Sequence, residues 1–196
     1  MGALHPGHLS LIERAGRPVP APDGRRHQPR VLVSLFVNPL QFGPGEDFQS
    51  YPRTLEADRA VAEAAGATAL FVPTADELFP GGDAGLTRVC PPPALLAGLC
   101  ARHRPGHFEG VATVVCRLLG LIRPEQLWLG EKDWQQLVVL RRVVADLGLP
   151  LQIRGCPTWR EADGVAGSSR NRYLSPSQRL QAAGLPRALD VGRAQV

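Results

Sequence analysis

Short apolar runs alternate with helical segments along this chain of 196 residues, and this alternation constrains the fold more than any other feature. Runs of β-branched and other apolar residues, typical of buried strands, lie at residues 31–37, 69–72, 126–129 and 151–155. Apolar residues recur at helical spacing around them, at 9–15, 53–65, 108–119 and 134–147, and Ser175-Pro176 starts one more helix. Strands that alternate with helices of about ten to fifteen residues indicate a parallel sheet. The sequence therefore predicts an α/β fold with a parallel sheet and helices on both of its faces.

Two regions lack this periodicity. Residues 16–30 are rich in Pro, Gly and Arg, and we expect a loop there without regular structure. Residues 80–105 are rich in turn-forming residues, and we expect one short extended piece within them at 87–90.

The charge pattern favours a small anionic ligand over a nucleic acid. The formal net charge is +4, and all but one of the 22 basic residues are arginines, the exception being Lys132. The arginines are scattered, and aromatic residues do not alternate with them as they do in a nucleic-acid groove.

The cysteines and the apolar stretches indicate a cytoplasmic protein. The four cysteines lack the C-x-x-C spacing, and we interpret them as reduced thiols. The longest apolar stretch, 110–122, contains Arg117 and is too short to cross a bilayer, so we expect no membrane partner. The polar, glycine-rich start predicts no signal peptide.

Polar residues directly follow two of the predicted strands. Residues 38–41 come after the first strand, and residues 130–133 come after the third. Because ligands of parallel α/β sheets bind at the carboxyl ends of the strands, we expect a binding site at this edge.

The two histidines of His5-Pro-Gly-His8 stand at the start of a predicted helix. As a metal site the pair lacks a third ligand, and two surface histidines in a turn are the plainer alternative. At a helix start, however, backbone N–H groups attract phosphate, and imidazoles can donate to oxygens on which charge develops. Gly2 and Gly7 would allow a close approach of the backbone.

Three further segments carry candidate ligand residues, each with a plainer alternative. Lys132 in GEKDWQQ (130–136) suits phosphate or is a solvated loop lysine, and Asp133 is a helix cap, a ribose ligand or both. The segment GSSRNR (167–172) offers donors for a triphosphate or is a serine-rich turn. Gln41 in NPLQFG (38–43) suits a polar or carboxylate substrate or is an ordinary turn residue.

In this order, these segments resemble the pantothenate synthetase (pantoate–β-alanine ligase) family. The matching stretches are MGALHPGHLSLI, FVNPLQFGPGEDFQSYPRTLEAD, RPGHFEGVATVV, GEKDWQQLVVLRRVVADLGLP and READGVAGSSRNRYLSP. They cover about four-fifths of the chain in register, which is more specific than any single motif. The family belongs to the HIGH-type nucleotidyltransferases, so the resemblance implies a Rossmann-like catalytic domain and a smaller C-terminal domain.

The resemblance implies an ATP-dependent ligase of pantothenate biosynthesis. Pantoate carboxylate would attack the α-phosphate of ATP, with Mg²⁺, to give pantoyl adenylate and pyrophosphate. The amine of β-alanine would then attack the adenylate and release AMP and pantothenate. The implied partners are these small molecules and a second copy of the chain in a homodimer, and the ligands of Mg²⁺ stay open.

The resemblance also implies the site residues by position. His5, His8 and Lys132 would be catalytic, with His8 as the proton donor of the family. Pantoate would bind to Gln41 and Gln136, and β-alanine to Gln41. The residues implied to bind ATP are Met1, Gly2, His5, His8, Gly130, Glu131, Lys132, Asp133, Trp159, Gly167, Ser168, Ser169 and Arg170.

Departures from the family pattern lead to further expectations. The family has a strand before MGALH and a longer C-terminal domain, and we expect both to be missing here. We therefore expect a catalytic domain at 1–174, with the proline-rich loop 16–30, and the start of a truncated C-terminal domain at 175–196.

Two residues near the expected nucleotide site also differ from the family pattern, and two other functions remain as alternatives. Gly167 replaces a larger apolar residue beside adenine, and Trp159 replaces a small residue. The alternatives are another HIGH-type nucleotidyltransferase and a nucleotide-binding remnant without catalysis. Gln41 and Gln136 favour pantoate over the substrates of the first alternative.

Overall fold

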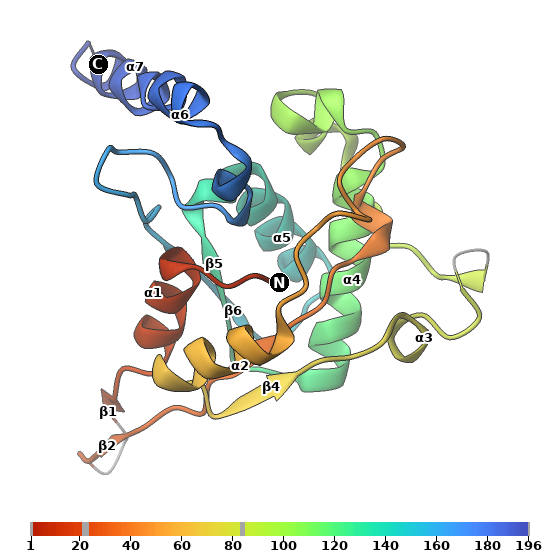
Figure 1. Ribbon diagram of the computed structural model, residues 1–196. Coiled ribbons are helices and arrows are strands. Elements are labelled where there is room, and N and C mark those ends of the chain that lie inside the picture. Colours follow the sequence, from red (N-terminus) through yellow and green to blue (C-terminus); the bar gives the residue numbers. More distant parts are fainter. Residues whose placement is uncertain (1, 21–23, 83–84, 196) are drawn as a thin grey trace.

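The computed structural model describes residues 2–20, 24–82 and 85–195 (Figure 1). Its helices are α1 (Pro6–Ala15), α2 (Leu55–Ala64), α3 (Ala75–Leu78), α4 (His107–Ile122), α5 (Trp134–Asp146), α6 (Pro176–Ala182) and α7 (Gly184–Arg193). Its strands are β1 (Val19–Pro20), β2 (Arg26–His27), β3 (Leu32–Ser34), β4 (Ala69–Phe71), β5 (Gln126–Gly130) and β6 (Gln152–Cys156). The four predicted strands and the main predicted helices are confirmed.

The central strands form two parallel pairs. In the first pair β3 lies beside β4, with Leu32 opposite Ala69. In the second β5 lies beside β6, with Gln126 opposite Gln152. The predicted parallel α/β architecture is therefore confirmed, but within the described residues no ladder joins one pair to the other.

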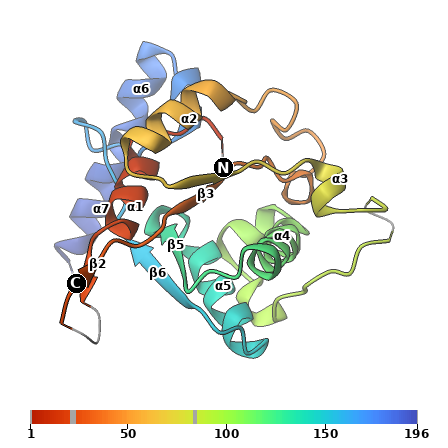
Figure 2. The same cartoon turned by 90° about the horizontal axis from the view of Figure 1, so that it is seen from below.

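Helices cover the strand pairs on two sides. Figure 2 shows α1 and α2 on one side of the strands, with α4 and α5 on the other. Ile12 of α1 and Ala62 of α2 pack with the apolar residues of β3 and its flanks in one buried cluster. A second cluster joins Phe108 and Ala112 of α4 to Val139 and Val143 of α5. This burial of one apolar face on each helix stabilises the arrangement more than intrinsic helix propensity does.

The expectation of an irregular loop at residues 16–30 is wrong. Residues 16–30 contain β1 and β2, which pair antiparallel with Val19 opposite His27. Gly24 adopts a positive φ of 78°, which glycine tolerates and which lets the chain reverse. The piece expected to be extended at 87–90 pairs with no strand in the described part of the chain, and the N–H of Val89 donates there to the hydroxyl of Thr113 on α4 (3.0 Å).

Two helices were not predicted, and one of them has a recognisable signal. Helix α3 begins with a capping box in which the Thr74 hydroxyl accepts from the N–H of Glu77 (3.2 Å), while the Glu77 carboxylate accepts from the N–H of Thr74 (2.7 Å). Helix α7 follows α6 directly, and its Leu185 and Leu189 side chains are exposed. The predicted Ser175 cap of α6 is confirmed. Among the described helices, none combines the length and the apolar character that a membrane crossing requires.

Candidate active site

The predicted N-terminal motif lies beside the segments 130–133 and 159–167. Helix α1 packs against β5, the strand that leads into Lys132 and Asp133, and the charges of these two residues act on the pKa of the His5 imidazole. A Cβ atom built on Gly7 would lie 3.5 Å from Cβ of Trp159, and one on Gly167 would lie 3.3 Å from Nδ1 of His5. Residues far apart in the sequence therefore meet at the start of α1, next to the carboxyl end of β5.

His5 and His8 cap the first turn of α1 with their own side chains. Nδ1 of His5 accepts from the N–H of Gly7 (3.2 Å), and Nδ1 of His8 accepts from the N–H of His5 (3.3 Å). The two rings lie 4.0 Å apart between centroids. Because both Nδ1 atoms accept, the proton of each neutral imidazole is on Nε2. Both histidines thus have an Nε2–H donor for a ligand.

Burial keeps these imidazoles neutral. It lowers the pKa of His5 below its ordinary value of 6.5, and Lys132 lowers it further. Burial also lowers the pKa of His8 to about 3, with His5 as the next contributor. At neutral pH the pair therefore presents uncharged hydrogen-bond donors beside the charge of Lys132.

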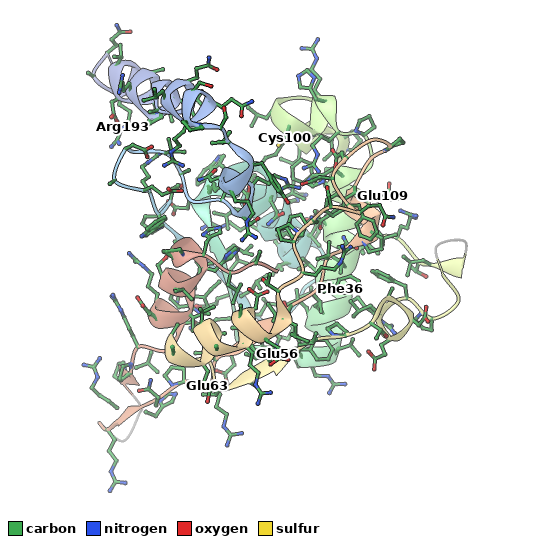
Figure 3. The ribbon with its side chains drawn as sticks, viewed as in Figure 1. Phe36, Glu56, Glu63, Cys100, Glu109 and Arg193 are labelled. Carbon is green, nitrogen blue, oxygen red and sulfur yellow. The ribbon has the colours of Figure 1, made fainter. Side chains whose placement is uncertain are left out.

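Asp58 fixes the backbone that leads into this motif. Its buried carboxylate on α2 accepts from the N–H groups of Ala3 (2.9 Å) and Leu4 (2.6 Å). The exposed Glu56 and Glu63 lie on the outer side of the same helix (Figure 3). Asp58 was not among the predicted site residues, although a lone acid among the inward positions of an amphipathic helix was the available signal. Gly2 is buried in the same segment, and Met1 lies outside the described residues.

The predicted segment 130–136 runs from the end of β5 through the turn 131–133 into the first turn of α5. Glu131, Lys132 and Asp133 form a short 3-10 turn after Gly130, and the side chains of Lys132 and Asp133 are exposed. Asp133 occupies the N-cap position of α5, but its side chain makes no capping hydrogen bond. Capping is therefore not what its carboxylate does. Gln136 is half-buried in the first turn of α5.

Gln135, beside Gln136, was not predicted to have a role and is a structural residue. Its side-chain N–H groups donate to the carbonyls of Leu95 and Gly98 (both 2.9 Å), and its Oε1 accepts from the N–H of Ala101 (3.2 Å). It thereby attaches the turn-rich segment 93–103 to α5. The repeated Gln-Gln in the sequence gave no way to tell the two roles apart.

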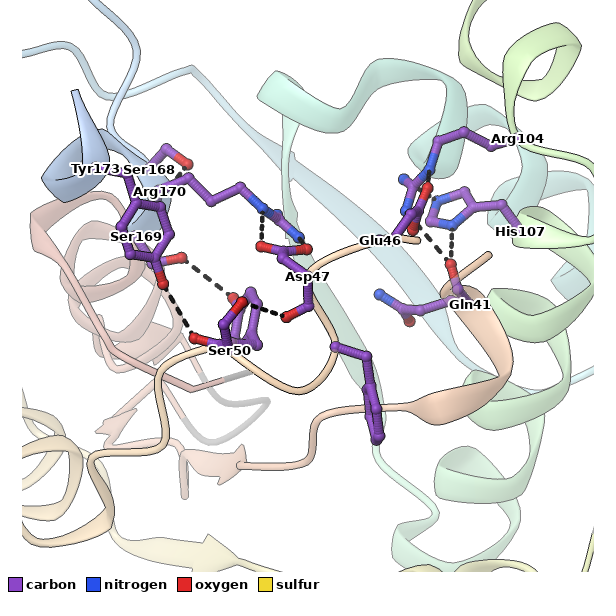
Figure 4. A network of polar contacts seen from close by, with 12 residues as sticks. Gln41, Glu46, Asp47, Ser50, Arg104, His107, Ser168, Ser169, Arg170 and Tyr173 are labelled. Carbon is purple, nitrogen blue, oxygen red and sulfur yellow. Dashed lines mark hydrogen bonds and ion pairs between the residues drawn. The ribbon is translucent and has the colours of Figure 1, made fainter. Parts of the chain in front are cut away.

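Gln41 lies in a 3-10 turn, Pro39–Gln41, that packs against the start of α4. The buried Asn38 donates to Oε1 of Gln41 and to the carbonyl of Gly110 (both 3.1 Å). The Gln41 carbonyl accepts from Nδ1 of His107 (2.8 Å) and from the Arg104 guanidinium (3.3 Å). Figure 4 shows Arg104 and His107 converging on this turn. Neither was among the predicted site residues, although both lie in the matching stretch RPGHFEGVATVV.

Ser169 and Arg170 contact the loop that follows Gln41, and Ser168 caps the turn that carries them. The Ser168 hydroxyl accepts from the N–H of Arg170 (3.2 Å), and the hydroxyls of Ser169 and Tyr51 lie 3.2 Å apart. The Arg170 guanidinium makes a two-pronged ion pair with Asp47 (both bonds 2.7 Å), which is drawn in Figure 4. It also lies 5.1 Å from the centre of the Tyr51 ring. Neither Asp47 nor Tyr51 was predicted to belong to the site.

Trp159 and Gly167 contact one another across a turn of the chain. The N–H of Gly167 donates to the carbonyl of Trp159 (3.0 Å). A Cβ atom on Gly167 would lie 2.6 Å from Cε3 of the Trp159 indole, which is closer than real Cβ contacts come. The two substitutions noted in the sequence therefore fit each other, because the indole fills the space of a side chain at 167.

The site combines hydrogen-bond donors that suit phosphate oxygens with the polar side chains of Gln41 and Gln136. Neutral imidazole N–H groups, one ammonium group and serine hydroxyls suit the oxygens of a phosphorylated ligand. Among the described residues, no cluster of three or more His, Cys, Asp or Glu side chains could enclose a metal ion. A Mg²⁺ ion bound mainly through ligand phosphates and water needs only one or two protein carboxylates, and Glu131 and Asp133 are the acids on the turn after β5.

Comparisons with known proteins match almost the whole chain. The sequence model of the family described as pantoate-beta-alanine ligase matches residues 1–195. The bifunctional pantoate ligase/cytidylate kinase of Synechococcus sp. (strain RCC307) is 59% identical over 193 residues, 98% of this chain and 36% of that protein. The corresponding protein of Parasynechococcus marenigrum (strain WH8102) is 59% identical over 189 residues, 96% of this chain and 36% of its own length. The chain thus spans about a third of these relatives.

Solved structures also match most of the chain. Pantothenate synthetase from Thermus thermophilus superposes with a TM-score of 0.87 at 52% identity, over 96% of this chain and 64% of that one. Pantoate-beta-alanine ligase from Francisella tularensis, solved in complex with beta-gamma ATP and beta-alanine, gives a TM-score of 0.85 at 37% identity. That match covers 97% of this chain and 69% of the other chain.

Proposed function

Because the chain belongs to the pantoate–β-alanine ligase family, we propose that it joins pantoate to β-alanine at the expense of ATP, through a pantoyl adenylate. The observation that carries this proposal is the meeting of the neutral His5 and His8 donors with Lys132 at the carboxyl end of β5. The beta-gamma ATP and beta-alanine in the complex of the Francisella tularensis relative support the choice of substrates.

The nucleotide would lie along the start of α1. Its phosphates would accept from Nε2–H of His5 and His8 and from the Lys132 ammonium, with Ser168, Ser169 and Arg170 at the outgoing pyrophosphate. Asp133 would lie near the ribose. The base would contact Trp159 and Gly167, and the remaining proposed ATP-binding residues are Met1, Gly2, Gly130 and Glu131. Mg²⁺ would arrive with the phosphates and help neutralise their charge.

The acyl substrate would bind on the side of Gln41 and Gln136. A pantoate carboxylate oxygen would attack the α-phosphorus of ATP, and the bond to the bridging oxygen would break to release pyrophosphate. The β-alanine amine, near Gln41, would then attack the acyl carbon, lose a proton and expel AMP. The chain would act by holding two anions together and stabilising the developing charge, which needs no covalent nucleophile.

The assembly and the cellular location are proposed on separate grounds. A homodimer follows from the family resemblance, and dynamic light scattering of the purified chain would test it. A cytoplasmic location agrees with four cysteines that are all free, with Cys156 fully buried.

Substitution of Lys132 tests the proposed function. We expect Lys132→Ala to lower pantoate-dependent pyrophosphate release from ATP by at least about 100-fold, because a charge that faces the reacting phosphates is lost. The matched control is Arg142→Ala on α5, since Arg142 is exposed and pairs only with Asp146 among the ion pairs described for it. Normal release by Lys132→Ala would refute the assignment, and release that ignores pantoate would refute the ligase reaction.

A further inference from the structure

We propose that His107, together with Arg104 and Glu46, is a positioning residue that sets the geometry of Gln41 for the acyl substrate. This inference rests on the proposed function, in which Gln41 contacts pantoate and β-alanine. His107 does not touch substrate in this proposal. It acts through the backbone of Gln41.

The first step is the protonation state of His107. Its Nε2 lies 3.1 Å from Nη1 of Arg104, and its Nδ1 lies 2.8 Å from the carbonyl oxygen of Gln41. A guanidinium can only donate, so Nε2 must accept. The proton of the neutral ring is therefore on Nδ1 and is donated to Gln41. His107 is buried, and its ring meets the Phe108 ring edge-on at 4.8 Å, so its orientation is fixed by packing.

The second step is the charge that orients Arg104. Glu46 accepts from Nε (2.7 Å) and Nη2 (2.6 Å) of Arg104, a two-pronged pair that fixes the plane of the guanidinium. From this plane Arg104 also donates to the Gln41 carbonyl (3.3 Å). A chain of contacts thus runs from Glu46 through Arg104 and His107 to one carbonyl (Figure 4).

The third step is the Gln41 side chain. Asn38 donates to its Oε1 (3.1 Å), which defines which end of the amide is oxygen. Nε2 of Gln41 is then the end that can donate to a carboxylate or hydroxyl of the acyl substrate. Backbone and side chain of Gln41 are thus held by separate contacts, as a preorganised ligand residue requires.

The fourth step is the close packing of the turn Pro39–Gln41 against α4. A Cβ atom on Gly110 would lie 2.1 Å from the carbonyl oxygen of Leu40, so only glycine allows this approach. Gly110 follows His107 by three positions and lies on the same face of α4. The turn that carries Gln41 is therefore in direct backbone contact with the helix that carries His107.

The test compares two substitutions of His107 in the full chain. His107→Phe keeps a ring but removes both hydrogen bonds, whereas His107→Asn places an amide nitrogen where Nδ1 lies. We expect His107→Phe to raise the KM for pantoate by about tenfold, as loss of one to two hydrogen bonds implies. We expect His107→Asn to stay within about threefold of the wild type, and neither change to move the KM for ATP more than about twofold.

Controls separate positioning from general damage. His103→Phe changes an exposed histidine that lies outside this network and should leave both KM values unchanged. In a Gln41→Ala background His107→Phe should add nothing to the KM for pantoate, because coupled residues are not additive. If His107→Phe does not fold, Glu46→Gln replaces it, and we expect about a threefold rise in the KM for pantoate alone.

The measured KM values for pantoate and ATP decide whether His107 positions Gln41. Equal KM values for pantoate in His107→Phe and His107→Asn would overturn the inference, as would an equal rise in the KM for ATP or full additivity with Gln41→Ala. Wild-type chain that binds ATP but releases no pantoate-dependent pyrophosphate would overturn the proposed function itself, and this inference with it.

Discussion

At the scale of single residues, the histidine pair of α1 has one protonation state that fits its contacts. Each Nδ1 accepts a backbone N–H, and burial lowers the pKa of both rings. An imidazolium at His8 would lose its Nδ1 acceptor and place a second charge beside Lys132. His8 is therefore suited to donate a hydrogen bond and is poorly suited to deliver a proton.

Substitutions of His8 separate these two roles. Glutamine can place an N–H near the position of Nε2 but cannot transfer a proton, whereas alanine offers neither. We expect His8→Gln to retain at least about tenfold more pantoate-dependent pyrophosphate release than His8→Ala, as the worth of a hydrogen bond to a charged acceptor implies. Initial rates at about pH 7.5, above the ordinary histidine pKa, measure this. Equal loss in both variants would show that proton transfer by His8 is essential.

At the scale of elements, the sequence predicted the regular structure better than the network around the site. Periodicity and capping residues located β3, β4, β5 and β6 and five of the helices, because these depend on local chemistry. The β1–β2 pair was missed because a proline-rich stretch hides its short ladder, and α3 was missed although Thr74 and Glu77 form a capping box.

The site residues also divide into those that the sequence predicted and those that only the structure shows. His5, Lys132 and Gly167 lie in motifs that the sequence displays, and the structure brings them together. Asp58 and His107 depend on contacts across 54 or more positions of the chain, such as those from Asp58 to the start of the chain and from His107 to Gln41. The sequence pattern marks Asp58 as a buried acid, but spacing along one chain does not show which distant backbone groups such residues bind.

The turn that joins Trp159 to Gly167 gives a prediction at this scale. Gly167→Ala forces a Cβ atom against the indole, and we expect a loss of about 1–3 kcal/mol in the free energy of unfolding. Trp159→Val removes the obstructing ring, so the double variant should recover most of that loss. Urea unfolding of the three variants and the wild type measures these free energies of unfolding. Additive losses in the double variant would show that the two residues are not matched in size.

At the scale of the whole molecule, helices hold together two strand pairs that share no ladder in the described residues. Helix α1 contacts both β5 and α2, while α4 contacts α5 and the turn after β3. The residues at these contacts include three histidines whose pKa is lowered by burial, His5, His8 and His107. Stability should therefore depend on pH through histidine burial.

The sign of this dependence follows from proton uptake. A histidine with a lowered pKa in the folded chain binds its proton mainly after unfolding, so protons favour the unfolded chain between about pH 6.5 and the folded pKa. We expect the urea midpoint to be highest above about pH 6.5 and to fall as the pH is lowered from about 7.5 to about 5. His8→Gln should weaken this fall, since the pKa of His8 is about 3 in the folded chain. An unchanged midpoint over this range would contradict the burial of neutral histidines.

The proposed function requires that this chain form an acyl adenylate from pantoate and ATP. Exchange of labelled pyrophosphate into ATP, with pantoate present and β-alanine absent, tests it most directly, because only a reversible adenylation step returns the label. We expect exchange that needs pantoate, is lost in Lys132→Ala and persists in Arg142→Ala. Exchange without pantoate, or equal exchange in Lys132→Ala and the wild type, would contradict it.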